Sequence, residues 1–307
     1  MTRRKKQDLI SMSDLSASDL FEIIDLTKKL KNKPLLKSTS LANKSIALIF
    51  AKPSLRTRVS FEVGINQLGG QPITIKMDEI SVGIRENVED IANVLSRYVS
   101  AVVIRTYEQE EIQDLGKFSL VPVINGLSNE EHPCQVISDL FTLSELFSDL
   151  KGLKLSYIGD GNNMTQSLIL GCALCGINIS IATPKTHKPK QYYVDAGKKI
   201  NSKIKIELTD DPKRAVKDAN ILYTDVWTSM GQEKEIESRK KIFSPYQINE
   251  ELLSVADKNG VVLHCLPAHK GQEITNTVFD RFSEVIYEQA ENRLHAQKAI
   301  LLKLIHG

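Results

Sequence analysis

Nine short apolar runs recur along the chain, and most are followed by a longer segment with helical spacing. The runs are four to six residues long, and most show no alternation of polar and apolar side chains. Strands of this kind are typical of parallel sheets that carry helices on both faces. The sequence therefore predicts an α/β fold, with strands at residues 46–50, 72–76, 101–105, 121–124, 154–158, 177–182, 204–208, 221–225 and 261–264.

The strands fall into two groups, which predicts two domains. Four lie before residue 130 and five after residue 150, and a long helix over 134–147 joins the groups. A chain of 307 residues is long enough for two domains of ordinary size. We predict two doubly wound domains, each with a mostly parallel sheet flanked by helices, linked by long helices and separated by a cleft. The first is residues 1–135 plus 287–307, because a last helix over 284–304 can return to it, and the second is residues 136–286.

Composition excludes several classes of partner. Forty basic residues against thirty-eight acidic ones leave no overall field for nucleic acid. The sequence contains no run of about eighteen apolar residues, which is the length that a membrane-spanning helix needs. The basic residues 3–6 are not followed by the apolar core of a secretory signal. The four cysteines are too few and scattered for a disulfide framework, so we expect reduced thiols and a cytoplasmic protein.

The segment after the first strand is suited to binding an anion. Residues 54–58 read Ser-Leu-Arg-Thr-Arg and lie where the first strand gives way to a predicted helix over 59–68. A helix N-terminus offers free N–H groups and the positive end of the helix dipole. Two hydroxyls and two guanidinium groups there suit a phosphate dianion. The alternative is a capped helix whose arginines point into solvent.

Other polar residues also follow predicted strands, and ligands of parallel α/β sheets bind at the carboxyl ends of the strands. Arg105 closes the third strand, and His132 and Gln135 follow the fourth. In the second domain the segments 159–164, 225–231 and 264–269 follow strands. The first domain thus offers cations, whereas the second offers amides, an acid and a thiol. This division suggests one anionic substrate and one that carries an amine.

Three other kinds of site fit the residues less well. The sequence Gly159-Asp160-Gly161 resembles a truncated dinucleotide fingerprint, but Met164 replaces its third glycine and no acid follows at residues 180–184. Adjacent residues of a strand face opposite sides, which argues against a catalytic pair of His264 and Cys265. No metal is expected, because His132 has no ligand at the required spacing and the C-x-x-C sequence at 172–175 lies in an apolar helix without a second pair.

Five motifs in register resemble those of the aspartate and ornithine carbamoyltransferases. Residues 54–58 resemble the carbamoyl-phosphate motif, and His-Pro-Cys-Gln at 132–135 resembles the His-Pro-x-Gln motif. Residues 225–231 and 264–268 are similar to the ornithine-binding segments of that family, and Glu-Asn-Arg at 291–293 also matches. The resemblance covers nearly the whole chain, in the expected order.

The resemblance implies transfer of the carbamoyl group of carbamoyl phosphate to the δ-amine of L-ornithine, which gives L-citrulline and phosphate. It implies a homotrimer, or a multiple of trimers, without metal or organic cofactor. The implied carbamoyl-phosphate residues are Ser54, Leu55, Arg56, Thr57, Arg105, His132, Gln135, Cys265, Leu266 and Arg293. The implied ornithine residues are Asn163, Asp225, Ser229 and Met230. Of these, Arg56, Arg105, His132, Asp225 and Cys265 are the expected catalytic residues, and the Leu266–Pro267 bond is expected to be cis.

Two positions depart from the family pattern. Leu55 stands where the family usually has threonine, so only its backbone could contact phosphate. Ser81 aligns with a longer side chain that reaches a neighbouring subunit in relatives, which leaves that contact open here.

A site rich in donors and poor in placed nucleophiles favours direct attack by the amine, without a covalent intermediate. Alternatives that remain are a carbamoyltransferase for another acceptor, such as putrescine or aspartate, a non-catalytic phosphate-binding relative, and a nicotinamide-dependent dehydrogenase.

Overall fold

The computed structural model describes residues 6–32, 38–77, 87–229 and 233–306. The chain divides into two compact units: unit 1 is Met1–Phe141 with Asn292–Gly307, and unit 2 is Thr142–Glu291. Two helices cross these boundaries, α6 (Pro133–Leu146) and α12 (Asn276–His306). The predicted boundaries were at residues 135 and 286, so the two divisions differ by a few residues at each crossing.

Unit 1 is built on a four-stranded parallel sheet in the order β2-β1-β3-β4. Its strands are β1 (Ser45–Phe50), β2 (Gln71–Lys76), β3 (Ala101–Arg105) and β4 (Val123–Leu127). Its helices are η1 (Met12–Asp14), α1 (Ala17–Lys31), α2 (Leu55–Gln67), α4 (Val88–Tyr98), α5 (Gln109–Phe118) and the adjoining parts of α6 and α12.

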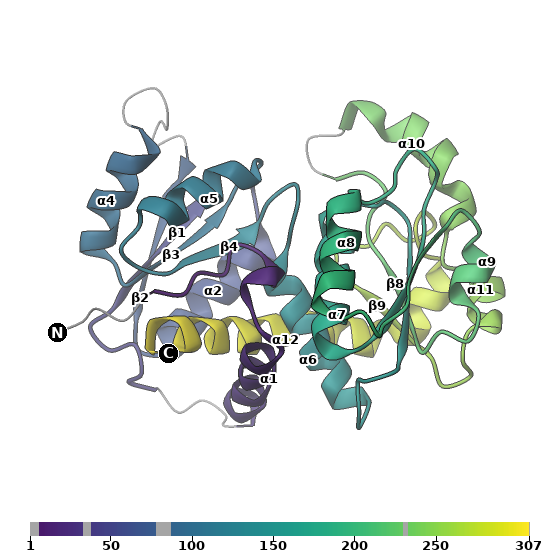
Figure 1. The fold of residues 1–307 in the computed structure, drawn as a ribbon, viewed down its shortest axis with the longest axis horizontal. Helices are drawn as coiled ribbons and strands as arrows, with labels where there is room; N and C mark the ends of the chain where they lie inside the picture. The colour runs from purple at the N-terminus through teal and green to yellow at the C-terminus, as the bar shows by residue number, and fades with distance from the viewer. Residues whose placement is uncertain (1–5, 33–37, 78–86, 230–232, 307) are drawn as a thin grey trace. The chain divides into compact units, whose positions relative to one another are not determined.

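Helices cover both faces of this sheet, as Figure 1 shows. On one face, α4 and α5 pack against β1 and β3 through a buried cluster that includes Ala47, Ile49 and Ile112. On the other face lie α2 and the C-terminal part of α12. These two helices approach closely at Gly64, where a Cβ atom would come within 3.1 Å of Lys298 Cγ. Buried strands with covered faces account for the apolar runs in the sequence.

Unit 2 is built on a five-stranded parallel sheet in the order β7-β6-β5-β8-β9. Its strands are β5 (Lys154–Ile158), β6 (Asn178–Ala182), β7 (Ile206–Thr209), β8 (Ile221–Thr224) and β9 (Val261–His264). Its helices are α7 (Asn163–Cys175), α8 (Gln191–Ile200), α9 (Pro212–Val216), η2 (Glu233–Glu235), α10 (Ile236–Phe243), η3 (Ser244–Tyr246), α11 (Glu250–Val255) and the first part of α12.

The helices α7 and α8 lie together beside one face of the unit 2 sheet (Figure 1). The opposite face packs against α9, α10, α11 and the start of α12 through one apolar cluster, which includes Leu222, Phe243, Leu252 and Phe279. Both units are therefore three-layered α/β folds, and the predicted fold class is confirmed.

The strand predictions are confirmed, although β4 and β7 each begin two residues later than predicted. Strand β4 begins at Val123 rather than at residue 121, because Val121 is held in a turn by Ser119, whose hydroxyl donates to Val121 O and accepts from Val121 N. The predicted start of the last helix, at residue 284, is wrong: α12 already begins at Asn276.

Each sheet has a point at which the order of its strands reverses. In unit 1 this point lies between β1 and β3, and in unit 2 between β5 and β8. Ligands of open α/β sheets bind outside the carboxyl ends of the strands at such points. The residues that follow β1, β3, β5 and β8 are therefore the expected ligand-binding positions.

Candidate active site

The first turn of α2 leaves backbone donors available in unit 1. Ser54 precedes the helix in an extended conformation, and the first helical bond runs from Arg58 N to Ser54 O at 3.3 Å. The N–H groups of residues 55–57 therefore have no acceptor within the helix. Within the described part of the chain, the Ser54 hydroxyl also makes no capping bond. This turn has the free donors and dipole orientation that favour an anion.

Thr57 brings two guanidinium groups together beside this turn. Arg293 Nη2, from α12, lies 2.7 Å from Thr57 Oγ1, and Arg105 Nη1, from the end of β3, lies 3.4 Å from the same oxygen. All three side chains are more than nine-tenths buried. The sequence-predicted residues Thr57, Arg105 and Arg293 thus meet within unit 1.

The electrostatics of this cluster show that positive charge is concentrated there. Burial, then Arg293 and Arg56, lower the pKa of Arg105 to about 10. Among the described residues, Arg105 Nε has no hydrogen-bond partner although it is buried. Like charges held together in a buried place are costly unless an anion neutralises them. The cluster is therefore suited to binding an anion.

His132 lies at the start of α6 and belongs to the same electrostatic environment. Burial holds its pKa well below the usual range, and Arg293, Arg105 and Arg56 lower it further. The imidazole is therefore neutral at neutral pH and can offer one N–H donor. A neutral donor can hold a carbonyl oxygen without adding another charge to the arginine cluster.

Gln135, on the first turn of α6, presents an acceptor rather than a donor. Its Nε2 donates to Asp139 Oδ1 at 2.9 Å, which fixes the orientation of the amide. Its Oε1 is buried and has no partner among the described residues. Its backbone N donates to His132 O at 3.1 Å. From their spacing in the sequence, His132 and Gln135 are predicted to form a clamp for a planar amide or carbonyl, and this clamp stays a prediction.

Lys52 is a candidate that the sequence analysis did not assign. Its ammonium group donates to Asn129 Oδ1 at 2.7 Å and lies 4.0 Å from the centre of the Tyr107 ring. Burial, then Arg105, lower the pKa of Lys52 to about 8. Its position directly after β1 was the only sequence signal, because both contacts come from residues distant in the chain.

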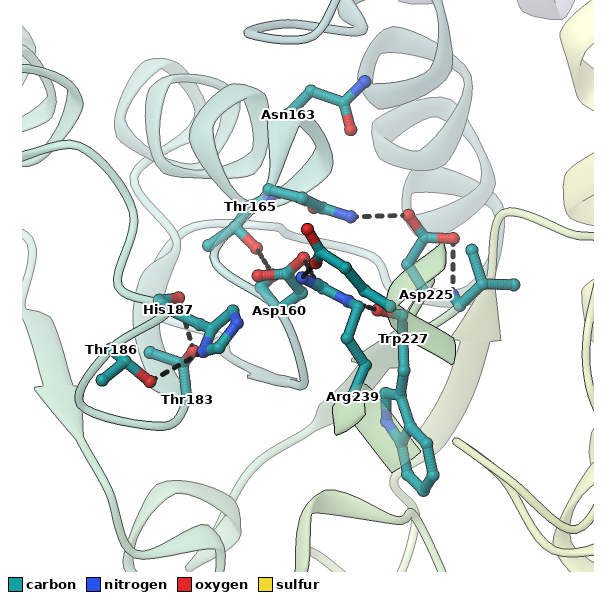
Figure 2. A network of polar contacts seen from close by, with 12 residues as sticks. Asp160, Asn163, Thr165, Thr183, Thr186, His187, Asp225, Trp227 and Arg239 are labelled. Carbon is teal, nitrogen blue, oxygen red and sulfur yellow. Dashed lines mark hydrogen bonds and ion pairs between the residues drawn. The ribbon is translucent and has the colours of Figure 1, made fainter. Parts of the chain in front are cut away.

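In unit 2, three strand ends converge on the carboxylate of Asp225. Its Oδ2 accepts from Asn162 Nδ2 at 2.9 Å, and its Oδ1 accepts from its neighbour Val226 N at 2.8 Å. Cys265 Sγ lies 3.0 Å from the same Oδ1 and can donate to it. Figure 2 shows the Asp225 carboxylate between its two nitrogen donors. The side chains of Asp225 and Cys265, predicted as catalytic, are thus in contact.

The two asparagines at the start of α7 have different roles. Asn162 is the N-cap, and its Oδ1 accepts from Met164 N at 3.0 Å and Thr165 N at 3.3 Å while its Nδ2 holds Asp225. Asn163 was the predicted ligand-binding residue. Its Oδ1 accepts from Met164 N at 2.9 Å. The sequence allows either asparagine to be a helix cap or a ligand-binding residue. Because Asn162 both caps α7 and contacts Asp225, it is an additional candidate.

A buried ion pair lies beside Asp225. Arg239 of α10 pairs with Asp160, which follows β5, and its Nε donates to Trp227 O (Figure 2). The Arg239 guanidinium also lies 5.0 Å from the centre of the Phe243 ring. Burial raises the pKa of Asp160 to about 6, which outweighs the lowering effect of Arg239. This pair ties α10 to the ends of β5 and β8.

The remaining predicted residues of unit 2 follow β8 and β9 in the chain. Ser229 is half-buried after β8, and Met230 lies outside the described residues, as does Ser81 of unit 1. Leu266 has a left-handed backbone, with φ of 57°, and the expected cis bond between Leu266 and Pro267 is present. The Leu55 side chain is 73% exposed, so it takes no part in the buried cluster around Thr57.

The described residues contain no group of three or more His, Cys, Asp or Glu side chains arranged to hold a metal ion. Among the described helices, none is both long and apolar enough to cross a membrane.

Two family models match the chain and together cover most of it. Residues 7–145 match the carbamoyl-phosphate-binding domain of aspartate/ornithine carbamoyltransferase, and residues 151–304 match its aspartate/ornithine-binding domain. The chain belongs to the aspartate/ornithine carbamoyltransferase family. The resemblance noted in the sequence is thereby confirmed.

Individual members of the family are similar over nearly the full length. The ornithine carbamoyltransferase of Archaeoglobus fulgidus is 50% identical over 299 residues, which are 97% of each chain. That of Nostoc punctiforme is 48% identical over 300 residues, again 97% of each chain. The solved structure of ornithine carbamoyltransferase from Pyrococcus furiosus has a TM-score of 0.94 at 42% identity, with 98% of each chain covered.

Proposed function

We propose that this chain is an ornithine carbamoyltransferase, which transfers the carbamoyl group of carbamoyl phosphate to the δ-amine of L-ornithine. The products are L-citrulline and phosphate. The observation that carries the proposal is the meeting of Arg105 and Arg293 at Thr57, beside the free donors of α2. The ornithine carbamoyltransferases of Archaeoglobus fulgidus and Nostoc punctiforme, which are 50% and 48% identical to this chain, support the choice of ornithine.

Carbamoyl phosphate is proposed to bind through its phosphate at the start of α2. Backbone N–H groups of residues 55–57, the Ser54 hydroxyl and the Arg56 and Arg105 guanidinium groups would share the phosphate oxygens. Leu55 would contribute only its N–H group. The carbamoyl oxygen would accept from Thr57, Arg105 and His132, and Gln135 Oε1 would accept from the carbamoyl amide. The full proposed set is Ser54, Leu55, Arg56, Thr57, Arg105, His132, Gln135, Cys265, Leu266 and Arg293.

Ornithine is proposed to bind in unit 2 through Asn163, Asp225, Ser229 and Met230. Asp225 already accepts from three donors, but a carboxylate has about four acceptor positions, so one can still receive an amino group. Its fixed orientation favours a role in orienting ornithine. A carboxylate also stabilises a protonated amine, which argues against Asp225 as the base that prepares the nucleophile.

The reaction is proposed to proceed by direct attack. The neutral δ-amine forms a bond to the carbamoyl carbon, and the bond from that carbon to the bridging phosphate oxygen breaks. The amine loses one proton, which the leaving phosphate takes up. Negative charge grows first on the carbonyl oxygen and then on the leaving phosphate, so fixed donors at both positions stabilise the transition state. An alkylamine has a pKa of about 10.4, so activity should rise with pH as the neutral form becomes more abundant.

An acceptor assay tests this function. Purified protein is incubated with carbamoyl phosphate and either ornithine, putrescine or aspartate, and the ureido product is measured by colour. Citrulline from ornithine, without comparable product from the other two, is the expected result. Product from putrescine alone would identify another acceptor. Carbamoyl-phosphate binding without any turnover would support the non-catalytic alternative.

A homotrimer is proposed as the assembly, and α2 supplies a surface for it. Leu55, Val59 and Val63 recur at a spacing of four residues and are 73%, 42% and 39% exposed. An exposed apolar stripe of this kind is typical of a contact surface. This gives Leu55 a role that does not require a phosphate contact.

Light scattering tests the assembly, with an expected mass three times the 34.4 kDa of one chain. Val59→Glu should reduce this mass, whereas Ile242→Glu, at a position 40% exposed in unit 2, should not. We also propose a cytoplasmic location, which the four free cysteines support.

A further inference from the structure

The imidazole of His264, the last residue of β9, makes hydrogen bonds at both of its nitrogens. Leu266 N donates to His264 Nδ1 at 2.8 Å, and His264 Nε2 lies 3.1 Å from Glu273 Oε1. Because a backbone N–H can only donate, Nδ1 must be the acceptor of that bond. The ring proton is therefore on Nε2, where it is donated to Glu273. The carboxylate thus selects the tautomer that can hold the Leu266 backbone.

Glu273 holds the other end of the same turn. Its Oε1 also accepts from His269 N, and the carboxylate has no exposed surface. The Glu273 carbonyl accepts from Ile248 N at 2.8 Å, which fixes the residue in the apolar core of unit 2. One buried carboxylate therefore ties together the residues on both sides of the segment 265–268.

The His264 backbone is anchored as well. His264 N donates to Gln289 Oε1 at 2.9 Å, and Gln289 Nε2 lies 3.3 Å from the hydroxyl of Tyr223 on the neighbouring strand. With its backbone and both ring nitrogens held, His264 has a single orientation. Neither His264 nor Glu273 belongs to the proposed ligand-binding set.

The segment that these bonds hold contains two proposed site residues. Cys265 Sγ contacts the Asp225 carboxylate at 3.0 Å. Leu266 has a φ of 57°, which is rare for a residue with a side chain and needs support from its surroundings. The bond from Leu266 N to His264 Nδ1 supplies that support.

We propose that Glu273 and His264 are positioning residues that hold Cys265 and Leu266 in the conformation required for carbamoyl transfer. This inference rests on the proposed function. Glu273 orients the imidazole, the imidazole holds the Leu266 N–H group, and the turn then places Cys265 against Asp225. Neither side chain is assigned a contact with substrate.

Graded variants separate positioning from simple structural support. Asparagine at position 264 can accept from the N–H group two residues later, as in an Asx turn. His264→Asn should therefore keep most of the turn, whereas His264→Leu cannot. Glu273→Gln keeps the shape and an acceptor oxygen, whereas Glu273→Leu removes the acceptor.

We expect kcat per active site to fall by about 10- to 100-fold in the leucine variants, because small misplacements near reacting groups have effects of that size. The Asn and Gln variants should remain within about threefold of the parent, because each keeps an acceptor at the required place.

Active sites are counted with a bisubstrate analogue that joins phosphonoacetyl and ornithine groups, so that unfolded protein does not enter kcat. Val262→Ala is the control, since it removes buried apolar contacts of β9 without touching these hydrogen bonds. It should lower the Tm and leave kcat per site unchanged. If the leucine variants behave like Val262→Ala, the two residues serve folding only and the inference is wrong.

A second readout does not depend on the acceptor substrate. Of the four cysteines, Cys265 is the most exposed at 8%, and its thiol is held against Asp225. Its modification by an aromatic disulfide should be at least about tenfold faster in His264→Leu than in the parent, and near the parent rate in His264→Asn. Equal rates in all variants would overturn the inference even where turnover is affected. If the parent chain produces no citrulline but the variants still differ from it in thiol reactivity, the proposed function is wrong. The role of His264 and Glu273 in placing the turn would then still stand.

Discussion

Asn162 donates from its side-chain amide to the Asp225 carboxylate, with 2.9 Å between Nδ2 and Oδ2. The bond joins the segment after β5 to the residue after β8, across the point at which the strand order of unit 2 reverses. Asn162 also caps α7 through Oδ1, so one side chain couples the start of that helix to the orientation of Asp225. The orientation of the Asp225 carboxylate thus depends on Asn162, which lies 63 residues earlier in the sequence.

Substitution of Asn162 by alanine should weaken ornithine binding selectively. The variant loses one hydrogen bond to a charged group, which is worth about 1.5–3 kcal/mol and corresponds to roughly a 10- to 100-fold change. We expect the KM for ornithine to rise within that range while the KM for carbamoyl phosphate stays near the parent value. Steady-state kinetics with each substrate varied in turn provides the measurement.

The matched control is Asn249→Ala. Asn249 is the N-cap of α11 in the same unit, and its Oδ1 accepts from Leu252 N at 3.0 Å. Each variant should lose about 0.5–2 kcal/mol of stability with its cap, but only Asn162→Ala should change the KM for ornithine. Equal kinetic effects would show that loss of a cap alone explains the result.

Thr57→Val should impair the carbamoyl-phosphate site without opening a cavity. Valine has nearly the same shape as threonine but cannot accept from Arg105 or Arg293, which now share Thr57 Oγ1. Both guanidinium groups would lose an acceptor, so we expect kcat/KM for carbamoyl phosphate to fall by at least about 100-fold. Thr57→Ser keeps the hydroxyl and should retain most of the activity. Parent-like kinetics in Thr57→Val would exclude Thr57 as the organiser of the two arginines.

The buried pair of Asp160 and Arg239 should dominate the local stability of unit 2. Arg239→Leu leaves the Asp160 carboxylate buried without its partner, and removing one member of a buried pair costs about 3–5 kcal/mol. The double variant with Asp160→Asn should recover much of the lost free energy of unfolding, because no buried charge is then left alone. Urea unfolding of the parent, both single variants and the double variant completes the cycle. Additive losses would mean that the two side chains do not interact energetically.

The sequence was sufficient for the fold because most strands of the two parallel sheets are buried apolar runs. The edge strand β2 is the exception, since it is largely exposed. The start of α12 was missed although Val278, Phe279 and Phe282 continue its apolar face into the core of unit 2. Thr275 Oγ1, which accepts from Val278 N at 3.3 Å, marks that start and was the available signal.

The candidate site was less predictable, since it depends on contacts between distant segments. Residues that match a family motif, such as Thr57 and Asp225, could be named from the sequence. Lys52 and Arg239 became candidates only when the fold placed them beside Asn129 and Asp160. The fold also distinguished Asn162 from Asn163, through the contact of Asn162 with Asp225. No local pattern encodes such pairs, because each joins two strand ends or a strand end and a helix.

The depressed pKa of His132 predicts a loss of stability in acid. Burial and three arginines keep the imidazole neutral in the folded protein, whereas in the unfolded chain it takes up a proton below its usual pKa of 6.5. The unfolded state therefore binds more protons below that pH, so the free energy of unfolding should fall as the pH is lowered. One proton corresponds to a slope of about 1.4 kcal/mol per pH unit.

Urea unfolding between about pH 7.5 and 5.5 measures this slope. His132→Gln should have a slope smaller by up to one proton. Bound phosphate should reduce the difference, because a dianion offsets the field of the arginines. His187→Gln is the comparison, since burial lowers the pKa of His187 as well but its side chain is only partly buried. Identical slopes in the parent and His132→Gln would mean that His132 is not held neutral.

Lys52 should make anion binding depend on pH in the alkaline range. Its pKa is lowered to about 8 by burial and Arg105, so the unliganded protein loses this positive charge as the pH rises through that value. A bound phosphate favours the ammonium form, and the affinity for inorganic phosphate should therefore decrease between about pH 7.5 and 9. Lys52→Met removes the charge while keeping a side chain of similar length, so it should bind phosphate more weakly at the lower pH and lack this pH dependence. Calorimetric titration of both proteins at the two pH values provides the test, and a parent affinity that stays constant across the range would show that Lys52 does not act on the anion.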